Sequence, residues 1–170
     1  MDITVAGFRI CGGNAYRNEV VTVSGNFNCS IQSVKVYFCV AYKMVRWKDH
    51  HDSVIVLPAY NEEQNIAHTA QVLTGILTKN QIDYELVFIS DGSCDGTFRE
   101  IKQAAEDNPH IKGAEFSRNF GKEAGIFAGL ELTTGDAVIV MDCDLQHPPE
   151  MIPKMWKLWQ EGAEVVEGIK

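Results

Sequence analysis

Short apolar runs alternate with amphipathic segments over residues 53–170, and this alternation constrains the fold more than any other feature of the sequence. After the first run, apolar side chains recur at helical spacing at Ile66, Leu73, Ile76 and Leu77. Strands that alternate with helices predict an α/β fold with a mostly parallel sheet covered on both faces. The strands expected from the apolar runs are 53–57, 84–90, 112–116, 137–141 and about 163–167.

Local signals predict where several helices begin. Thr97 with Glu100 predicts a capping box at the start of one helix. Residues 121–132 are expected to form another helix despite their glycines. Pro148 and Pro149 stand where proline is tolerated, in the first turn of a helix. The inner face of that last helix is expected to carry Ile152, Met155, Trp156 and Trp159.

Residues 1–52 differ from the rest of the chain. Apolar side chains alternate from Val34 to Val40, which predicts one strand, and no cluster in this part resembles a site. We therefore expect two parts. Residues 1–52 form an unassigned extension, either a small β appendage or a poorly ordered stretch, and residues 53–170 form one partial α/β domain.

Composition narrows the classes of partner. The net charge of -8 argues against non-specific binding to nucleic acid and to anionic bilayers. The best apolar run, 34–42, is too short to cross a bilayer. The five cysteines form no CxxC pair, which favours reduced thiols and a cytoplasmic protein.

Polar clusters follow three of the expected strands. They are PAYNEE (58–63), SDGSCDGT (90–97) and DCD (142–144). In parallel sheets, ligands bind beyond the carboxyl ends of the strands, at the point where the strand order reverses. We expect the first and fourth strands to be neighbours, which would bring the three clusters together in one crevice.

Two carboxylates at a strand end repel each other unless a cation neutralises them. Oxygen ligands of this kind suit Mg²⁺ or Mn²⁺, which usually keep room for substrate phosphate oxygens. Asp142 and Asp144 are therefore candidate metal ligands. Nearby, Tyr60 could stack on a flat base, and Asp91 could accept hydrogen bonds from a base or ribose. The helix that begins near Glu62 would direct its positive end at phosphate.

Four motifs of the chain resemble a family 2 glycosyltransferase with the GT-A fold. The resemblance is strongest to the polyprenyl-phosphate sugar transferases, such as dolichol-phosphate mannose synthase and bactoprenol glucosyltransferase. It covers about residues 53–170, and Ser90 stands where the family often has the first aspartate of DDGS. The motifs are VIVLPAYNEEQNI, ISDGSCDGT, FSRNFGKEAGIFAGL and VIVMDCDLQHPPEMI.

The resemblance implies a set of site residues. Asp142 and Asp144 would hold Mg²⁺ or Mn²⁺ against the diphosphate of a sugar nucleotide, and Asp91 would contact the base. Arg118 and Lys122 match the basic stretch of the family and would face phosphate. The nucleoside pocket would be lined by Pro58, Ala59, Tyr60 and Glu62.

The function that the resemblance implies is the transfer of a sugar from a UDP- or GDP-sugar to a polyprenyl (dolichyl or undecaprenyl) phosphate. We expect this chain to be the Rossmann-like, donor-binding half of such an enzyme, truncated at the C-terminus. The acceptor-binding residues and any membrane helices would follow Lys170 and bring the complete protein to the cytoplasmic face of a membrane. A phosphate nucleophile is ionised at pH 7, so no general base is assigned.

Two other classes stay open at this point. A haloacid-dehalogenase-like phosphohydrolase would use Asp142 as its nucleophile, but it requires the first strand of the fold there and Thr or Val at the position of Gln146. A non-catalytic nucleotide-binding fragment would carry the same clusters without transfer. The sequence contains no GxGxxG after a strand and no GxxxxGK[ST], which argues against dehydrogenases and P-loop enzymes.

Overall fold

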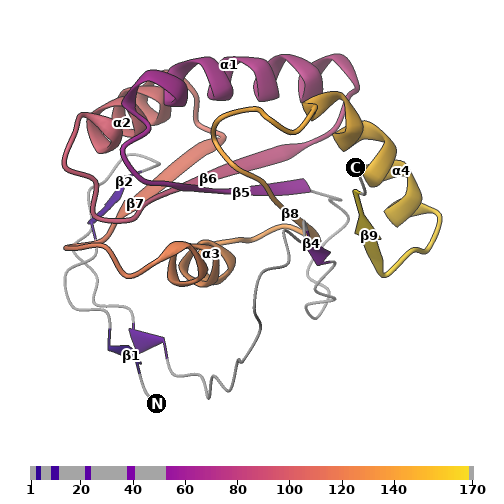
Figure 1. Ribbon diagram of the computed structural model, residues 1–170. Helices are drawn as coiled ribbons and strands as arrows, with labels where there is room; N and C mark the ends of the chain where they lie inside the picture. Colours follow the sequence, from indigo (N-terminus) through magenta and orange to yellow (C-terminus); the bar gives the residue numbers. More distant parts are fainter. Residues whose placement is uncertain (1–2, 5–8, 12–21, 24–37, 41–52, 169–170) are drawn as a thin grey trace.

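The computed structural model of the protein describes residues 3–4, 9–11, 22–23, 38–40 and 53–168. Within these residues, one sheet has the strand order β2-β7-β6-β5-β8-β4-β9, and β1 pairs with β3 in a separate two-stranded sheet (Figure 1). The elements are β1 (Ile3–Thr4), β2 (Arg9–Cys11), β3 (Thr22–Val23), β4 (Phe38–Val40), β5 (Ser53–Ala59), α1 (Glu63–Lys79), β6 (Tyr84–Ser90), α2 (Thr97–Asp107), β7 (Ile111–Glu115), α3 (Lys122–Glu131), β8 (Ala137–Val140), η1 (Pro149–Met151), α4 (Ile152–Gln160) and β9 (Val165–Glu167).

Four parallel strands, β7, β6, β5 and β8, form the centre of the main sheet. Ser53 at the start of β5 pairs with Tyr84 of β6 on one side and with Ala137 of β8 on the other. The expectation that the first and fourth strands of this unit are neighbours is therefore confirmed. The chain adds β6 and β7 on one side of β5 and then returns to add β8 on the other, so the strand order reverses between β5 and β8.

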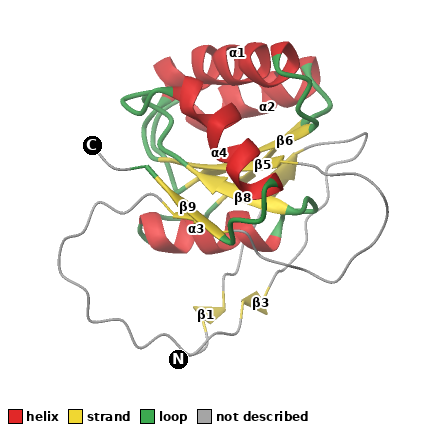
Figure 2. Cartoon of the chain, turned by 90° about the vertical axis from the view of Figure 1, so that its right-hand side faces the viewer, coloured by secondary structure: helices red, strands yellow, loops and turns green. Residues whose placement is uncertain are grey.

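Helices cover both faces of the parallel strands (Figures 1 and 2). Ile55 and Leu57 of β5 belong to the buried cluster on the face that carries α1, α2 and α4. Val54 and Val56 alternate with them and join the cluster on the face that carries α3. Because all four side chains are buried, β5 is an apolar run without polar alternation, as its sequence predicted.

Two glycines let α3 lie close to β5. A Cβ atom at Gly129 would stand 2.3 Å from Cγ1 of Val56, closer than real Cβ atoms approach other atoms. A Cβ atom at Gly125, one turn earlier, would stand 3.6 Å from Cβ of Pro58. Gly125 and Gly129 thus allow α3 to pack closely on the sheet. The N-terminus of α3 is thereby held beside the end of β5.

The outer strands are antiparallel to their neighbours. β2 pairs with β7, and β4 pairs with both β8 and β9. The strand expected near 163–167 is present as β9, but it is joined to β8 through β4 and not directly. Two strands of the sheet therefore come from the first 52 residues, and the remainder of the strand expected from Val34 to Val40 lies outside the described residues.

Two expectations about helix starts need correction. Thr97 is the first residue of α2 and not its cap: Gly96 precedes it, and the Thr97 hydroxyl donates to Asp95. The proline pair opens the 3-10 turn η1 before α4 begins at Ile152. The inner face of α4 is as expected, with Ile152 and Trp156 buried and Met155 and Trp159 packed against the same core.

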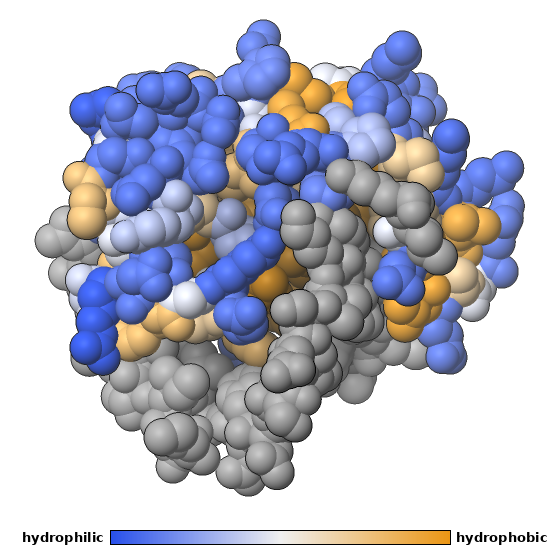
Figure 3. Space-filling model, in the orientation of Figure 1, coloured by the Kyte–Doolittle hydropathy of each residue, from blue (hydrophilic) through white to orange (hydrophobic). Residues whose placement is uncertain are grey.

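No helix among the described residues is long and apolar enough to span a membrane. Polar side chains cover most of the α1 and α2 surface, and apolar side chains are visible between that layer and α3 (Figure 3).

Candidate functional site

The loops that follow β5 and β6 form one hydrogen-bonded unit. The backbone amide of Asn61 donates to Oγ of Ser93 at 3.1 Å, and the amide of Cys94 donates to Oδ1 of Asn61 at 2.9 Å. The amide of Gly96 donates to Oε2 of Glu63 at 2.5 Å. Asn61 has a positive φ of 57°, an uncommon conformation that these contacts hold.

Two backbone amides at the start of α1 are bonded to the loop that follows β6. The amide of Glu62 donates to Oγ1 of Thr97 at 2.8 Å, and the amide of Glu63 donates to Oδ2 of Asp95 at 3.3 Å. Burial raises the pKa of Asp95, but the hydrogen bonds from Thr97 and Glu63 outweigh it, so the pKa lies below its usual value. These two amides are therefore engaged by the neighbouring loop, and phosphate binding by the start of α1 stays a prediction.

Tyr60 and Glu62 lie in the loop that follows β5. The Tyr60 side chain is 49% exposed, so its ring is available for contact with a ligand. Glu62 is half-buried and accepts a hydrogen bond from Nδ2 of Asn65 at 2.6 Å. Ala59 is buried and Pro58 is half-buried, and the carbonyl oxygen of Ala59 accepts the amide of Asp91 at 2.8 Å.

Asp91 holds the loop that leads into α3. Its carboxylate is 3% exposed and accepts the amides of Phe120 at 2.7 Å and Gly121 at 2.9 Å. The next residue, Gly92, has a φ of 63°, and a Cβ atom there would stand 2.2 Å from the carbonyl carbon of Arg118. Asp91 and Gly92 together fix the path of the loop from Arg118 to Gly121, a role that the sequence analysis did not identify. Contact between Asp91 and a base stays a prediction.

Lys122 and Asp142 form an ion pair at the carboxyl edge of the sheet. Lys122 is the first residue of α3, and its Nζ lies 2.5 Å from Oδ1 of Asp142 just beyond β8. The guanidinium of Arg118 lies 4.9 Å from the centre of the Phe120 ring and is exposed. Lys122, one of the two predicted basic residues, therefore contacts Asp142, a predicted metal ligand, because α3 begins at the edge of the sheet where β8 ends.

Asp144 is exposed and begins a turn. Its Oδ1 accepts the amide of Gln146 at 3.1 Å, and Leu145 between them has a positive φ of 54°. A bulky residue in that conformation is uncommon and is tolerated only where the surroundings hold it. Asp144 thus has a second carboxylate oxygen directed away from this turn bond.

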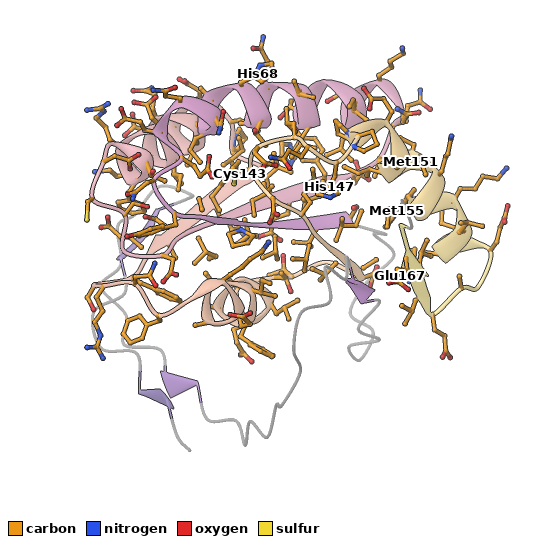
Figure 4. The ribbon with its side chains drawn as sticks, in the orientation of Figure 1. His68, Cys143, His147, Met151, Met155 and Glu167 are labelled. Carbon is orange, nitrogen blue, oxygen red and sulfur yellow. The ribbon has the colours of Figure 1, made fainter. Side chains whose placement is uncertain are left out.

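Cys143 separates the two aspartates and is buried beneath α1 (Figure 4). Its carbonyl oxygen accepts a hydrogen bond from Oγ1 of Thr69 at 2.5 Å, and its Sγ lies 3.5 Å from the carbonyl oxygen of Pro58. Burial raises the pKa of the Cys143 thiol well above its usual value, and the negative charges of Glu62 and Asp142 add to this effect. The thiol is therefore neutral and serves packing.

The chemistry of the two carboxylates fits a hard divalent cation that shares its coordination with a substrate. Among the residues that the structure describes, no group of three or more His, Cys, Asp and Glu side chains is arranged to hold a metal ion alone. Mg²⁺ is usually bound through one or two carboxylates together with substrate phosphates and water. Asp142 and Asp144 would supply such a partial set of hard oxygen ligands, and Lys122 lies beside Asp142.

Curated relatives match the part of the chain that carries these clusters. The family model for glycosyl transferase family 2 matches residues 54–169. The uncharacterized glycosyltransferase YkcC of Bacillus subtilis is 40% identical over 121 residues, which cover 71% of this chain and 38% of the relative. The bactoprenol glucosyl transferase of Shigella phage SfX is 44% identical over 112 residues, which cover 66% of this chain and 37% of the relative. The chain thus spans little more than a third of the length of these relatives.

Solved structures share the arrangement of strands and helices. Glucosyl-3-phosphoglycerate synthase from Mycobacterium tuberculosis, in complex with Mn²⁺, uridine diphosphate and glucosyl-3-phosphoglycerate, aligns with a TM-score of 0.52 and 22% sequence identity. The alignment covers 72% of this chain and 47% of that structure. At this identity the likeness concerns the fold, which is the α/β arrangement of GT-A glycosyltransferases. Together with the family match, it shows that the chain belongs to glycosyl transferase family 2.

Proposed function

We propose that this chain is the donor-binding part of a metal-dependent glycosyltransferase that moves a sugar from a nucleotide-sugar to a polyprenyl phosphate. The observation that carries the proposal is the meeting of Asp142 and Lys122 at the edge where the strand order reverses. At that edge, a carboxylate is suited to bind the metal ion of a metal diphosphate, and an ammonium group is suited to bind a phosphate oxygen. The named function of relatives such as the phage bactoprenol glucosyl transferase supports the choice of acceptor.

The nucleoside part of the donor would lie against the loops that follow β5 and β6. Tyr60 offers an exposed aromatic face for a base. The mutual hydrogen bonds of Asn61 with Ser93 and Cys94 keep the two loops in one shape before a ligand arrives. Such preorganisation lowers the entropy that binding would otherwise cost.

The diphosphate would lie between the end of β8 and the start of α3. Asp142 and Asp144 would hold Mg²⁺ or Mn²⁺ there, and the bound ion would stabilise the negative charge of the leaving nucleoside diphosphate. Lys122 would release Asp142 and bind a phosphate oxygen of the donor instead. Arg118, exposed on the loop that Asp91 holds, would add a second positive charge on the same side.

The phosphohydrolase alternative is less consistent with the topology. That chemistry requires the nucleophilic aspartate after the first strand of the parallel unit, whereas Asp142 follows β8, which is the last of the four to occur in the chain.

The test is calorimetric titration of the chain with UDP and with GDP, in Mn²⁺ and in excess chelator. We expect chelator to weaken binding of the preferred nucleotide by at least about tenfold, the lower range of effects seen when even an outer partner of a metal is lost. Asp144→Asn should remove the dependence on Mn²⁺. The matched control is Asp83→Asn, an exposed carboxylate that precedes β6 at the opposite edge of the sheet.

The proposal fails if both nucleotides bind with the same affinity in Mn²⁺ and in chelator. It also fails if Asp83→Asn alters the metal dependence as strongly as Asp144→Asn. Transfer to a lipid phosphate is then measured with radiolabelled UDP- and GDP-sugars on the complete protein, and absence of transfer there would favour the nucleotide-binding alternative.

A further inference from the structure

The residue between the two aspartates is anchored at two points. The Cys143 carbonyl oxygen accepts a hydrogen bond from Oγ1 of Thr69 at 2.5 Å, and the Cys143 thiol donates to the carbonyl oxygen of Pro58, with 3.5 Å between sulfur and oxygen. Thr69 is 0% exposed and Cys143 is 2% exposed. The loop after β8 is thereby attached to α1 and to the end of β5 at the position that separates Asp142 from Asp144.

The bond from Thr69 is unusual for a threonine inside a helix. A helical threonine commonly returns its hydroxyl bond to a carbonyl one turn earlier on the same helix. The Thr69 hydroxyl instead reaches a carbonyl that is 74 residues away in the sequence. A buried hydroxyl without a partner would be costly, so this bond couples the position of the loop to the position of α1.

The anchor also determines where the two carboxylates point. Cys143 and Asp144 lie in a turn that follows β8. With the Cys143 side chain held in the core, the two aspartates lie nearer the surface, since Asp142 is half-buried and Asp144 is exposed. The positive φ of Leu145 then turns the chain back toward α1 and η1.

We infer that Thr69 is a positioning residue for the metal site, which it serves by fixing the Cys143 carbonyl so that Asp142 and Asp144 face one ion. This inference rests on the proposed function, because it takes the two carboxylates to be metal ligands. Thr69 touches neither the ion nor the substrate. Its role is like that of outer partners in other metal sites, whose loss typically costs 10- to 100-fold in metal affinity.

The experiment compares two substitutions at Thr69 with a control on the same helix. Thr69→Val keeps the shape of the side chain and removes the donor, and Thr69→Ser keeps the donor. The control is Thr74→Val, since the Thr74 hydroxyl accepts a bond from Asn108 and lies one and a half turns from Thr69. Mn²⁺ affinity is measured by electron paramagnetic resonance in the presence of saturating UDP.

We expect Thr69→Val to weaken Mn²⁺ binding by about tenfold or more, whereas Thr69→Ser and Thr74→Val stay within about twofold of wild type. A second readout is the reactivity of the Cys143 thiol toward an alkylating reagent, followed by mass spectrometry of its peptide. Release of the loop should raise that reactivity in Thr69→Val and leave it low in Thr74→Val.

The outcomes separate this inference from the proposed function. Wild-type protein that binds Mn²⁺ while Thr69→Val binds it equally well would overturn the positioning role and leave the proposed function standing. Wild-type protein that binds no Mn²⁺ with UDP would overturn both. Equal losses in Thr69→Val and Thr74→Val would show that general destabilisation of α1, and not the bond to Cys143, affects the ion.

Discussion

Lys122 and Asp142 neutralise each other at the carboxyl edge of the sheet, with 2.5 Å between Nζ and Oδ1. Any cation that binds Asp142 must compete with this ammonium group. Partly exposed ion pairs contribute about 0.2–1 kcal/mol, which corresponds to at most about fivefold in affinity. The ion pair is therefore weak enough for Asp142 to bind a metal ion and for Lys122 to bind a phosphate instead.

This competition predicts opposite effects of one substitution. Lys122→Met should raise the affinity of the protein for Mn²⁺ alone by up to about fivefold. With UDP present it should lower the affinity for the nucleotide, because a charge-assisted bond to phosphate is lost. Mn²⁺ titrations with and without UDP measure both effects.

The control for this prediction is Lys154→Met, which removes an exposed lysine of α4. Unchanged Mn²⁺ affinity in Lys122→Met, or the same change in both variants, would contradict the role assigned to Lys122.

Residue contacts of this kind were the least predictable part of the site. Asp142 and Asp144 could be identified because a single residue separates them in the sequence and they follow an apolar run. The partner of Asp142 lies 20 residues earlier, on another element, and Thr69 lies 74 residues from Cys143. Neither pairing has a local pattern, since it arises only when α1, α3 and β8 are packed on the same sheet.

At the scale of elements, the contact between α3 and β5 depends on Gly129. A side chain at this position meets Val56, which is fully buried and has no room to move. We expect Gly129→Ala to destabilise the protein by about 1–3 kcal/mol, the usual cost of overpacking a core. The measurement is the free energy of unfolding in urea.

A second glycine provides the matched comparison. A Cβ atom at Gly75 on α1 would meet nothing within 4 Å. Gly75→Ala should therefore stabilise the protein by about 0.5–1 kcal/mol, because alanine favours the helix. The account of α3 packing is wrong if Gly129→Ala is as stable as wild type while Gly75→Ala behaves as expected.

The elements themselves could be predicted where apolar residues set their length. β6 spans the predicted residues 84–90 because every residue after Tyr84 is buried. The start of α2 was assigned incorrectly because Asp95, two residues before Thr97, bonds both the amide and the hydroxyl of Thr97 and replaces a capping box. A Thr and a Glu at capping-box spacing therefore predict a helix start only when no side chain just before the Thr already bonds it.

At the scale of the whole molecule, the parallel arrangement of the central strands followed from the alternation of strands and helices. The adjacency of β5 and β8 placed three polar clusters at one edge, as the sequence predicted. A strand was expected from the alternation of Val34 to Val40, but the position of β4 between β8 and β9 was not predicted, because alternation does not identify the partners of a strand. The parallel centre was thus predictable, and the antiparallel edges were not.

The measurement that tests the central claim most directly is a crystal structure of this chain with Mn²⁺ and UDP, in which the anomalous signal locates the metal. We predict one Mn²⁺ within about 2.1 Å of carboxylate oxygens of both Asp142 and Asp144 and of a diphosphate oxygen, since Mn²⁺ is expected to resemble Mg²⁺ in bond length. Lys122 should then contact phosphate and not Asp142. A structure with UDP bound in the crevice and Mn²⁺ absent or held elsewhere would contradict the account.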